Sequence, residues 1–171
     1  MAKVRILGID PGLNNTGWGV VDSCGGVFDF VAAGILHSDV KKTLAERLCE
    51  LHKGLLAVID EFSPDEASVE QTFVNKNPNS TLKLGQARGA VIVAPALKGI
   101  PVFEYAPNQI KKMIVGAGHA DKTQVDMMVR TMLKGLDRDS KLGPDASDAL
   151  AMALTHAYMR SAVGVALEKN K

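Results

Sequence analysis

The chain has 171 residues, of which 46% are hydrophobic and 23% are charged, and this is enough for one domain with a sizeable core. A net charge of +1 at pH 7 argues against nucleic-acid binding through bulk basicity, so any such surface must be a local patch. Two cysteines without metal-ligand spacing, no signal peptide and no long apolar run favour a cytoplasmic protein.

The first third of the chain predicts an antiparallel meander followed by a helix. Residues 5–10 are an apolar run that ends in Asp-Pro-Gly, which indicates a buried strand entering a turn. Two more strands are expected at residues 16–22 and 27–36, with a Gly-containing turn between them. Residues 44–62 then carry apolar side chains at helical spacing, and Ser-Pro ends this helix.

The rest of the chain alternates between strands and helices. Strands are expected at residues 67–70 and 101–105. Helices are expected at residues 80–97, 107–113, 122–134 and 145–162, and the tail after about residue 163 is expected to be disordered. This order predicts an α/β fold with a mixed five-stranded sheet and helices on both faces, in a single domain over residues 1–171.

Four acidic residues occupy positions where a carboxylate is either functional or a local cap. Asp10 ends a buried strand, where an unpaired carboxylate is costly, although it could also cap its own turn. Glu70 ends another strand and, taken alone, is more often solvated than functional. Asp145 and Asp148 are spaced i, i+3 at a helix start and share one face, but capping of the helix dipole explains them nearly as well.

The combination of these acids is more specific than any one of them. If the strands that end in Asp10 and Glu70 are neighbours, their ends lie about 5 Å apart, and the start of the last helix would complete a four-acid cluster. Such a cluster needs cations, and oxygen-only ligands suit Mg²⁺, with Mn²⁺ able to substitute. Two such ions about 4 Å apart can activate water and stabilise the leaving 3′ oxygen of a phosphodiester. The acids therefore predict a metal-dependent nuclease.

Four segments also form a pattern in a defined order: GIDPGLNNTGWGVV, VEQTFVNKNPNSTLKLGQARG, DKTQV and PDASDALAMALTHA. In that order they resemble the bacterial RuvC family of Holliday junction resolvases, from about Val4 to Arg160. The Asp-Pro-Gly turn alone is weak, whereas the GQARG helix together with the D-x-x-D-A-L-A helix is specific. The resemblance implies a ribonuclease-H-like fold and a catalytic, metal-binding tetrad of Asp10, Glu70, Asp145 and Asp148. Relatives can carry His at the position of Asp145.

The resemblance further implies a crossover junction endodeoxyribonuclease that acts in recombination and DNA repair. A homodimer would bind a four-way junction and cut two like-polarity strands symmetrically, leaving 5′-phosphate ends, with two metal ions in each site during cleavage. A contact with the RuvA–RuvB branch-migration complex and a place in the bacterial cytoplasm are implied by the family only. The helix with Gly85 and Gly89 is implied in the dimer interface, although packing on its own sheet also explains these small residues.

DNA contacts are expected from one aromatic residue and several basic residues. Phe73 alone reads slightly better as a core anchor, whereas the resemblance implies a ring that stacks on an unpaired base, worth about 1–3 kcal/mol. Scattered lysines are usually solvated, and phosphate contacts from them would give salt-dependent affinity rather than sequence reading. The expected basic contacts are Lys76, Lys83, Arg88, Lys111 and Lys122, of which Lys111 and Lys122 match positions near the active site in the family.

Three other functions remain as alternatives. An actin-like or sugar-kinase ATPase begins in a similar way but needs a second lobe, for which 171 residues leave no room. A binding module without catalysis would not need all four acids. A nuclease of the same fold that acts on RNA or on other DNA is disfavoured by Phe73 and the GQARG segment.

Overall fold

The computed structural model describes residues 2–71, 77–116, 121–137 and 139–168, with side chains described as far as residue 161. These residues form a mixed sheet of six strands in the order β5-β4-β1-β2-β3-β6. β1, β2 and β3 pair antiparallel, whereas β4 is parallel to β1, β5 to β4 and β6 to β3. The strands are β1 (Val4–Asp10), β2 (Asn15–Cys24), β3 (Val27–His37), β4 (Glu66–Glu70), β5 (Val102–Tyr105) and β6 (Leu133–Lys134). The predicted meander is confirmed.

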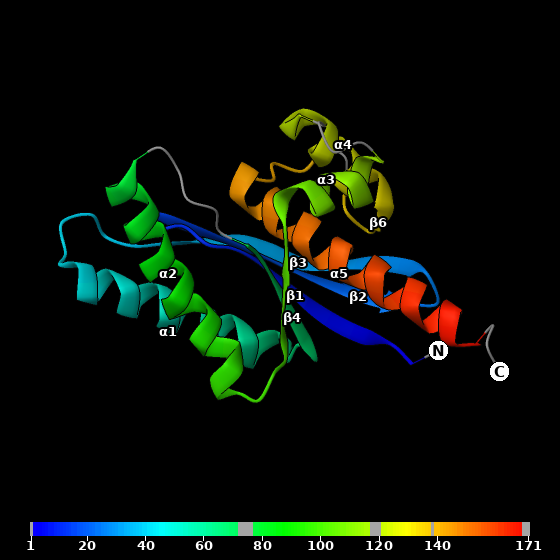
Figure 1. The fold of residues 1–171 in the computed structure, drawn as a ribbon, viewed down its shortest axis with the longest axis horizontal. Coiled ribbons are helices and arrows are strands. Elements are labelled where there is room, and N and C mark those ends of the chain that lie inside the picture. The colour runs from blue at the N-terminus through cyan, green and yellow to red at the C-terminus, as the bar shows by residue number, and fades with distance from the viewer. Residues whose placement is uncertain (1, 72–76, 117–120, 138, 169–171) are drawn as a thin grey trace.

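Helices cover both faces of this sheet (Figure 1). On one face lie α1 (Leu44–Phe62) and α2 (Pro78–Leu97). On the other lie α3 (Pro107–Val115), α4 (Lys122–Met132) and α5 (Pro144–Glu168). The predicted α/β class is confirmed, and the single domain predicted over residues 1–171 stays a prediction. Among the described residues, no helix combines the length and apolarity needed to cross a membrane.

The sheet contains a sixth strand where the sequence predicted five. Residues 133 and 134 were expected to end the helix over residues 122–134, but α4 ends at Met132 and β6 follows. β6 exists because Leu133 and Lys134 pair with Phe28 and Asp29 of β3. Two residues are too few to show the alternation that identifies a strand, so only the tertiary contact reveals this one.

The last helix is longer than predicted. α5 continues to Glu168, beyond the expected end at residue 162 and into the tail that was expected to be disordered after about residue 163. This stretch ends in Ala-Leu-Glu, which are strong helix formers, and no proline interrupts it. Residues 169–171 lie outside the described residues.

Capping chemistry sets the ends of the two helices on the first face. α1 spans the predicted residues 44–62, because Thr43 and Glu46 form a capping box at its start and Ser63, at a φ of 48°, ends it. α2 begins at Pro78, two residues earlier than the predicted residue 80. The side chain of Asn77 accepts hydrogen bonds from the backbone at the start of this helix, and proline suits its first position.

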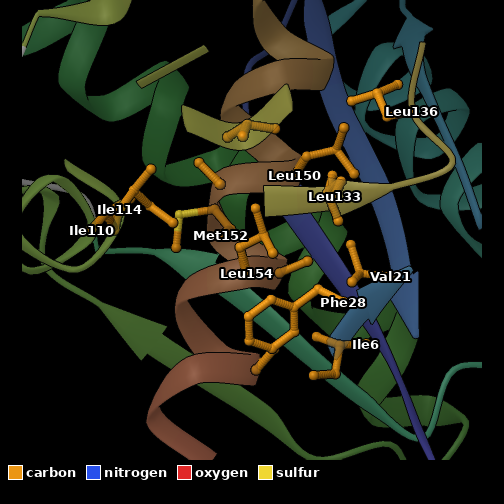
Figure 2. Packing of buried hydrophobic residues seen from close by; sticks show 14 of the residues in the cluster. Ile6, Val21, Phe28, Ile110, Ile114, Leu133, Leu136, Leu150, Met152 and Leu154 are labelled. Carbon is orange, nitrogen blue, oxygen red and sulfur yellow. The ribbon is translucent and has the colours of Figure 1, made fainter. Parts of the chain in front are cut away.

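Alternate residues of β1 supply two hydrophobic clusters on opposite faces of the sheet. Leu7 and Ile9 pack among the apolar residues of α1 and α2. Ile6 packs on the other face with residues of α3, α4 and α5, among them Leu150 and Met152 (Figure 2). This period of two places every second side chain of β1 beneath α5, and Asp10 falls in that series.

A buried ion pair ties β1 to β2. Asp22 accepts hydrogen bonds from the Arg5 Nε and Nη2 atoms at 2.8 and 2.9 Å, and Lys3 Nζ lies 2.8 Å from the same carboxylate. The bond from Arg5 is the main reason why the pKa of Asp22 falls from 3.8 to about 2. Only 9% of the Asp22 side chain is exposed, and its lowered pKa means that the charged carboxylate stabilises the folded state above about pH 4.

A second polar group ties α5 to the strands β4 and β5. The ring of His156 lies between the Glu66 carboxylate, 2.6 Å from Nε2, and the Tyr105 hydroxyl, 2.7 Å from Nδ1. A carboxylate only accepts, so Nε2 carries the hydrogen and Nδ1 accepts from Tyr105. Burial lowers the pKa of His156, and this effect exceeds that of Glu66, which raises the pKa. The lowered pKa favours this neutral ring.

Candidate active site

The ends of β1 and β4 bring two of the four acids together. The strands pair in parallel with Ile9 opposite Val69, and Asp10 and Glu70 are the next and last residues of these strands. Their ends therefore lie side by side, which was the condition for a shared site. Glu70 lies four residues after Glu66, whose carboxylate bonds to α5, so the alternation along β4 turns Glu70 toward the same helix.

Glycines allow the start of α5 to lie very close to the sheet. A Cβ atom on Gly8 would lie 1.9 Å from the carbonyl oxygen of Ala149. A Cβ atom on Gly17 would lie 1.9 Å from the carbonyl oxygen of Asp145. Any side chain at either position would collide with helix backbone, so these glycines bring Asp148 down over the ends of β1 and β4.

Three of the four acids open into one pocket of about 250 Å³. Asp10, Glu70 and Asp148 line it together with the ammonium-bearing side chains of Lys111 and Lys122. The rest of the wall is apolar: Pro107, Ile110, Val125, Ala151 and Met152. Charges on such a wall interact more strongly than in bulk water.

The Asp10 carboxyl shows how crowded the negative charge is in this pocket. Burial, followed by the charges of Asp148, Glu70 and Asp145, raises its pKa from 3.8 to about 7. Burial and the charge of Asp148 also raise the pKa of Glu70. The Nζ atom of Lys122 lies 2.8 Å from Asp148 Oδ2, and this hydrogen bond raises the pKa of Lys122. Lys122 does not neutralise all the negative charge of these acids, because the pKa of Asp10 stays raised despite it.

Asp145 lies beside this pocket rather than in it. It lines a neighbouring pocket of about 450 Å³ with Asn14, Arg47 and Lys83, while its charge still acts on Asp10. Within the described ranges, no three His, Cys, Asp or Glu side chains lie close enough to hold a metal ion as they stand. The predicted four-acid cluster is therefore divided into three acids and one, with the Lys122 ammonium as the cation at Asp148.

The predicted DNA-binding residues fall in different places. Lys111 and Lys122 line the pocket of the three acids. Lys83 lines the neighbouring pocket, beside Asp145. Phe73 and Lys76 lie outside the described residues.

Arg88 bonds to the protein itself. Its Nε donates to the backbone carbonyl oxygen of Glu70 at 3.1 Å, and its Nη2 donates to the Glu104 carboxylate at 2.7 Å. Only 19% of its side chain is exposed. A DNA contact for Arg88 stays a prediction.

Sequence reasoning missed residues that shape the site without being acidic or lysine. The Gly-x-Gly of residues 17–19 inside an apolar strand was a usable signal, since glycine in a strand often marks a close approach of backbone. Arg47 gave no such signal. It holds the turn after β1 by donating to the Leu13 carbonyl and the Asn14 side chain, at 3.4 and 2.5 Å.

Comparison with known proteins gives consistent matches over most of the chain. Residues 6–156 match the family model described as crossover junction endodeoxyribonuclease RuvC. The protein of that name from Methylocella silvestris is 57% identical over 94% of this chain and 89% of its own length.

Solved structures extend this likeness to the fold. The T. thermophilus RuvC in complex with a Holliday junction substrate matches with a TM-score of 0.84 at 34% identity, over 92% of this chain and 95% of that one. The yeast mitochondrial Holliday junction resolvase matches with a TM-score of 0.68 at 14% identity, over 98% of this chain and 82% of that one, which shows a shared fold. The ribonuclease-H-like fold is confirmed.

Proposed function

Because this chain belongs to the RuvC family of crossover junction endodeoxyribonucleases, we propose that its acidic pocket hydrolyses phosphodiester bonds in four-way DNA junctions. One observation carries this assignment to particular residues. Asp10, Glu70 and Asp148 come from three separate elements and face one pocket that also holds Lys111 and Lys122. Acids that only capped local turns or a helix would not converge in this way.

The family is one of metal-dependent nucleases, and the residues of this site fit divalent ions. All four acids offer oxygen ligands, which suit Mg²⁺ and, in its place, Mn²⁺. Asp10 keeps its proton up to a pH of about 7 because it is buried and has negative charge around it, so the site favours added cations. Asp10 and Glu70 would hold metal most directly, with Asp148 completing the shell and Asp145 binding or orienting a second ion. When bound, two ions supply the charge that lets water attack phosphorus and lets the 3′ oxygen leave.

The two lysines of the pocket would bind DNA phosphates. Lys111 and Lys122 would bind the negatively charged backbone beside the scissile bond, with an affinity that falls as salt rises. Lys122 exchanges Asp148 for a phosphate when DNA enters, which frees the carboxylate for its cation. The family resemblance is the basis for two further contacts. Phe73 would stack on an unpaired base, and Lys76 would contact a phosphate.

A twofold-symmetric pair of these chains suits the symmetry of the substrate. Each copy would cut one of two like-polarity strands, leaving 5′-phosphate ends, so that both nicks fall in one binding event. Exposed apolar residues on α2, which include Leu82, Val93 and Leu97, support a dimer through this helix. Work in the bacterial cytoplasm and contact with the RuvA–RuvB complex complete the proposal and come from the family alone.

The decisive test is cleavage of a synthetic four-way junction, with a linear duplex of the same sequence as control. The wild type is expected to cut only the junction, and only with Mg²⁺ or Mn²⁺. Asp10→Asn is expected to bind the junction and leave it uncut. The matched variant Asp60→Asn changes an exposed acid of α1 that pairs with Lys98, and it is expected to cut at the wild-type rate.

Three outcomes would overturn the assignment. Cleavage by Asp10→Asn at the normal rate in Mg²⁺ would remove the acids from the mechanism. Equal cutting of the linear duplex would make the protein a general nuclease of this fold. If the wild type binds the junction but does not cut it, the protein is a binding module without catalysis.

A further inference from the structure

Arg88 joins the ends of two strands to the middle of α2. Its two hydrogen bonds reach the Glu70 carbonyl oxygen on β4 and the Glu104 carboxylate on β5. In the register of these strands, Val69 lies opposite Glu104 and Glu70 lies opposite Tyr105. The guanidinium therefore lies where β4 ends, at the residue whose carboxylate enters the acidic pocket.

We propose that Arg88 is a positioning residue for the cleavage reaction: it fixes the backbone of Glu70, so that the Glu70 carboxylate stays in the pocket with Asp10 and Asp148. This inference rests on the proposed function of that pocket. Glu104, on the neighbouring strand β5, orients the guanidinium by accepting its second hydrogen bond.

The chemistry of the two bonds requires arginine. Nε and Nη2 lie on one edge of a planar group and present two parallel N–H donors. Here one donor bonds to the Glu70 carbonyl oxygen and the other to the Glu104 carboxylate, so one rigid guanidinium contacts both the end of β4 and a side chain of β5. A lysine in this place keeps the charge but has a single flexible ammonium, which cannot hold both acceptors in the same geometry.

The charge balance around Arg88 also separates it from the lysines that face the pocket. Glu104 neutralises its guanidinium at 2.7 Å, so little positive charge is left for a phosphate. Lys122 has an exposed side chain and Lys111 lines the pocket opening. Removing Arg88 should therefore disturb the geometry of Glu70 more than the binding of DNA.

The test separates binding from cutting on a synthetic four-way junction. Junction affinity is measured without divalent metal, and the cleavage rate is measured in Mg²⁺ with protein in saturating excess. For Arg88→Lys, the rate at saturation is expected to fall by about 10–100-fold, the usual cost of losing an outer orienting contact, while the junction Kd changes less than about twofold. Urea unfolding checks that the variant is folded before either measurement.

Lys83→Met on the same helix is the contrasting variant. Lys83 lines the neighbouring pocket, so its loss should raise the junction Kd and lower the salt dependence of binding by about one phosphate contact, which is the opposite pattern to that expected for Arg88→Lys. Glu104→Gln should lower the saturated rate by a smaller factor than Arg88→Lys. The double variant of Arg88→Lys with Glu104→Gln should be no slower than Arg88→Lys alone, because both residues act on Glu70 through the same guanidinium.

The proposal is wrong if Arg88 behaves as a phosphate contact. In that case Arg88→Lys cuts at the wild-type rate once saturated, and Glu104→Gln binds the junction more tightly because a repelling charge is gone. This failure is distinct from failure of the proposed function. If Asp10→Asn is inactive and Arg88→Lys is not impaired, the acidic pocket stands and only the positioning role falls.

Discussion

The Asp10→Asn variant should be more stable than the wild type when no metal is present. In the folded protein, burial and three neighbouring carboxylates raise the pKa of Asp10 to about 7, against 3.8 for a free side chain. Between these two values the unfolded chain has lost the proton while the folded chain keeps it, so stability falls as the pH rises. Above about pH 7 the folded state must carry a charge that it disfavours.

The size of the effect follows from that gap. Three pH units correspond to about 4 kcal/mol, which is an upper bound because water that enters the pocket screens part of the effect. Asparagine has the shape of the protonated acid and never ionises. The free energy of unfolding of Asp10→Asn should therefore exceed that of the wild type by about 2–4 kcal/mol at pH 8.5. At pH 4 the two should be almost equal.

Urea unfolding in EDTA at several pH values measures this difference directly. Asp22→Asn is the opposing control, because bonds from Arg5 lower the pKa of Asp22 to about 2. That carboxylate stabilises the fold above pH 4 and loses its effect as the pH falls toward 2, so its replacement should cost about 1–2 kcal/mol at pH 7. Added Mg²⁺ should stabilise the wild type far more than Asp10→Asn. Parallel stability curves for the wild type and Asp10→Asn at every pH would refute the charge-crowding argument.

Three further substitutions probe the packing of α5 on the sheet. Gly8→Ala places a methyl group 1.9 Å from the Ala149 carbonyl oxygen, so it should destabilise the fold by about 3 kcal/mol and slow junction cleavage, as urea unfolding and a cleavage assay will show. Ser68→Ala removes a buried hydroxyl that has no partner among the described residues, and urea unfolding should show a gain of about 1 kcal/mol. Burial lowers the pKa of His156, so the unfolded chain takes up a proton first as the pH falls below about 6.5, and the wild type should lose stability there more steeply than His156→Gln. An equal slope in pH-dependent unfolding would show that His156 stays uncoupled from stability.

The sequence predicted the elements that local chemistry marks. The end of α1 was predicted from the Ser-Pro stop, and the Asp10 and Glu70 strands were recognised as short segments with an acid at the end. The convergence of these two acids was predicted only on the condition that their strands are neighbours, which the parallel pairing of β1 with β4 satisfies.

What escaped prediction depends on contacts between distant parts of the chain. β6 is defined by its partner in β3 and not by its own two residues. Apolar residues occur around much of α2, so the sequence could not show that Arg88 turns toward the ends of β4 and β5. Asp145 was predicted at the start of the last helix, where α5 begins, but the sequence could not show that it lines a different pocket from Asp148.

The acidic pocket joins the first strand of the chain to its last helix. While a ribosome is still making the protein, Asp10 and Glu70 emerge first, and Asp148 and the helix that carries it follow much later. Contacts between such distant segments form late, after the intervening chain has been ordered. A nascent chain, or one that stops before α5, therefore lacks Asp148 and has no complete acidic pocket.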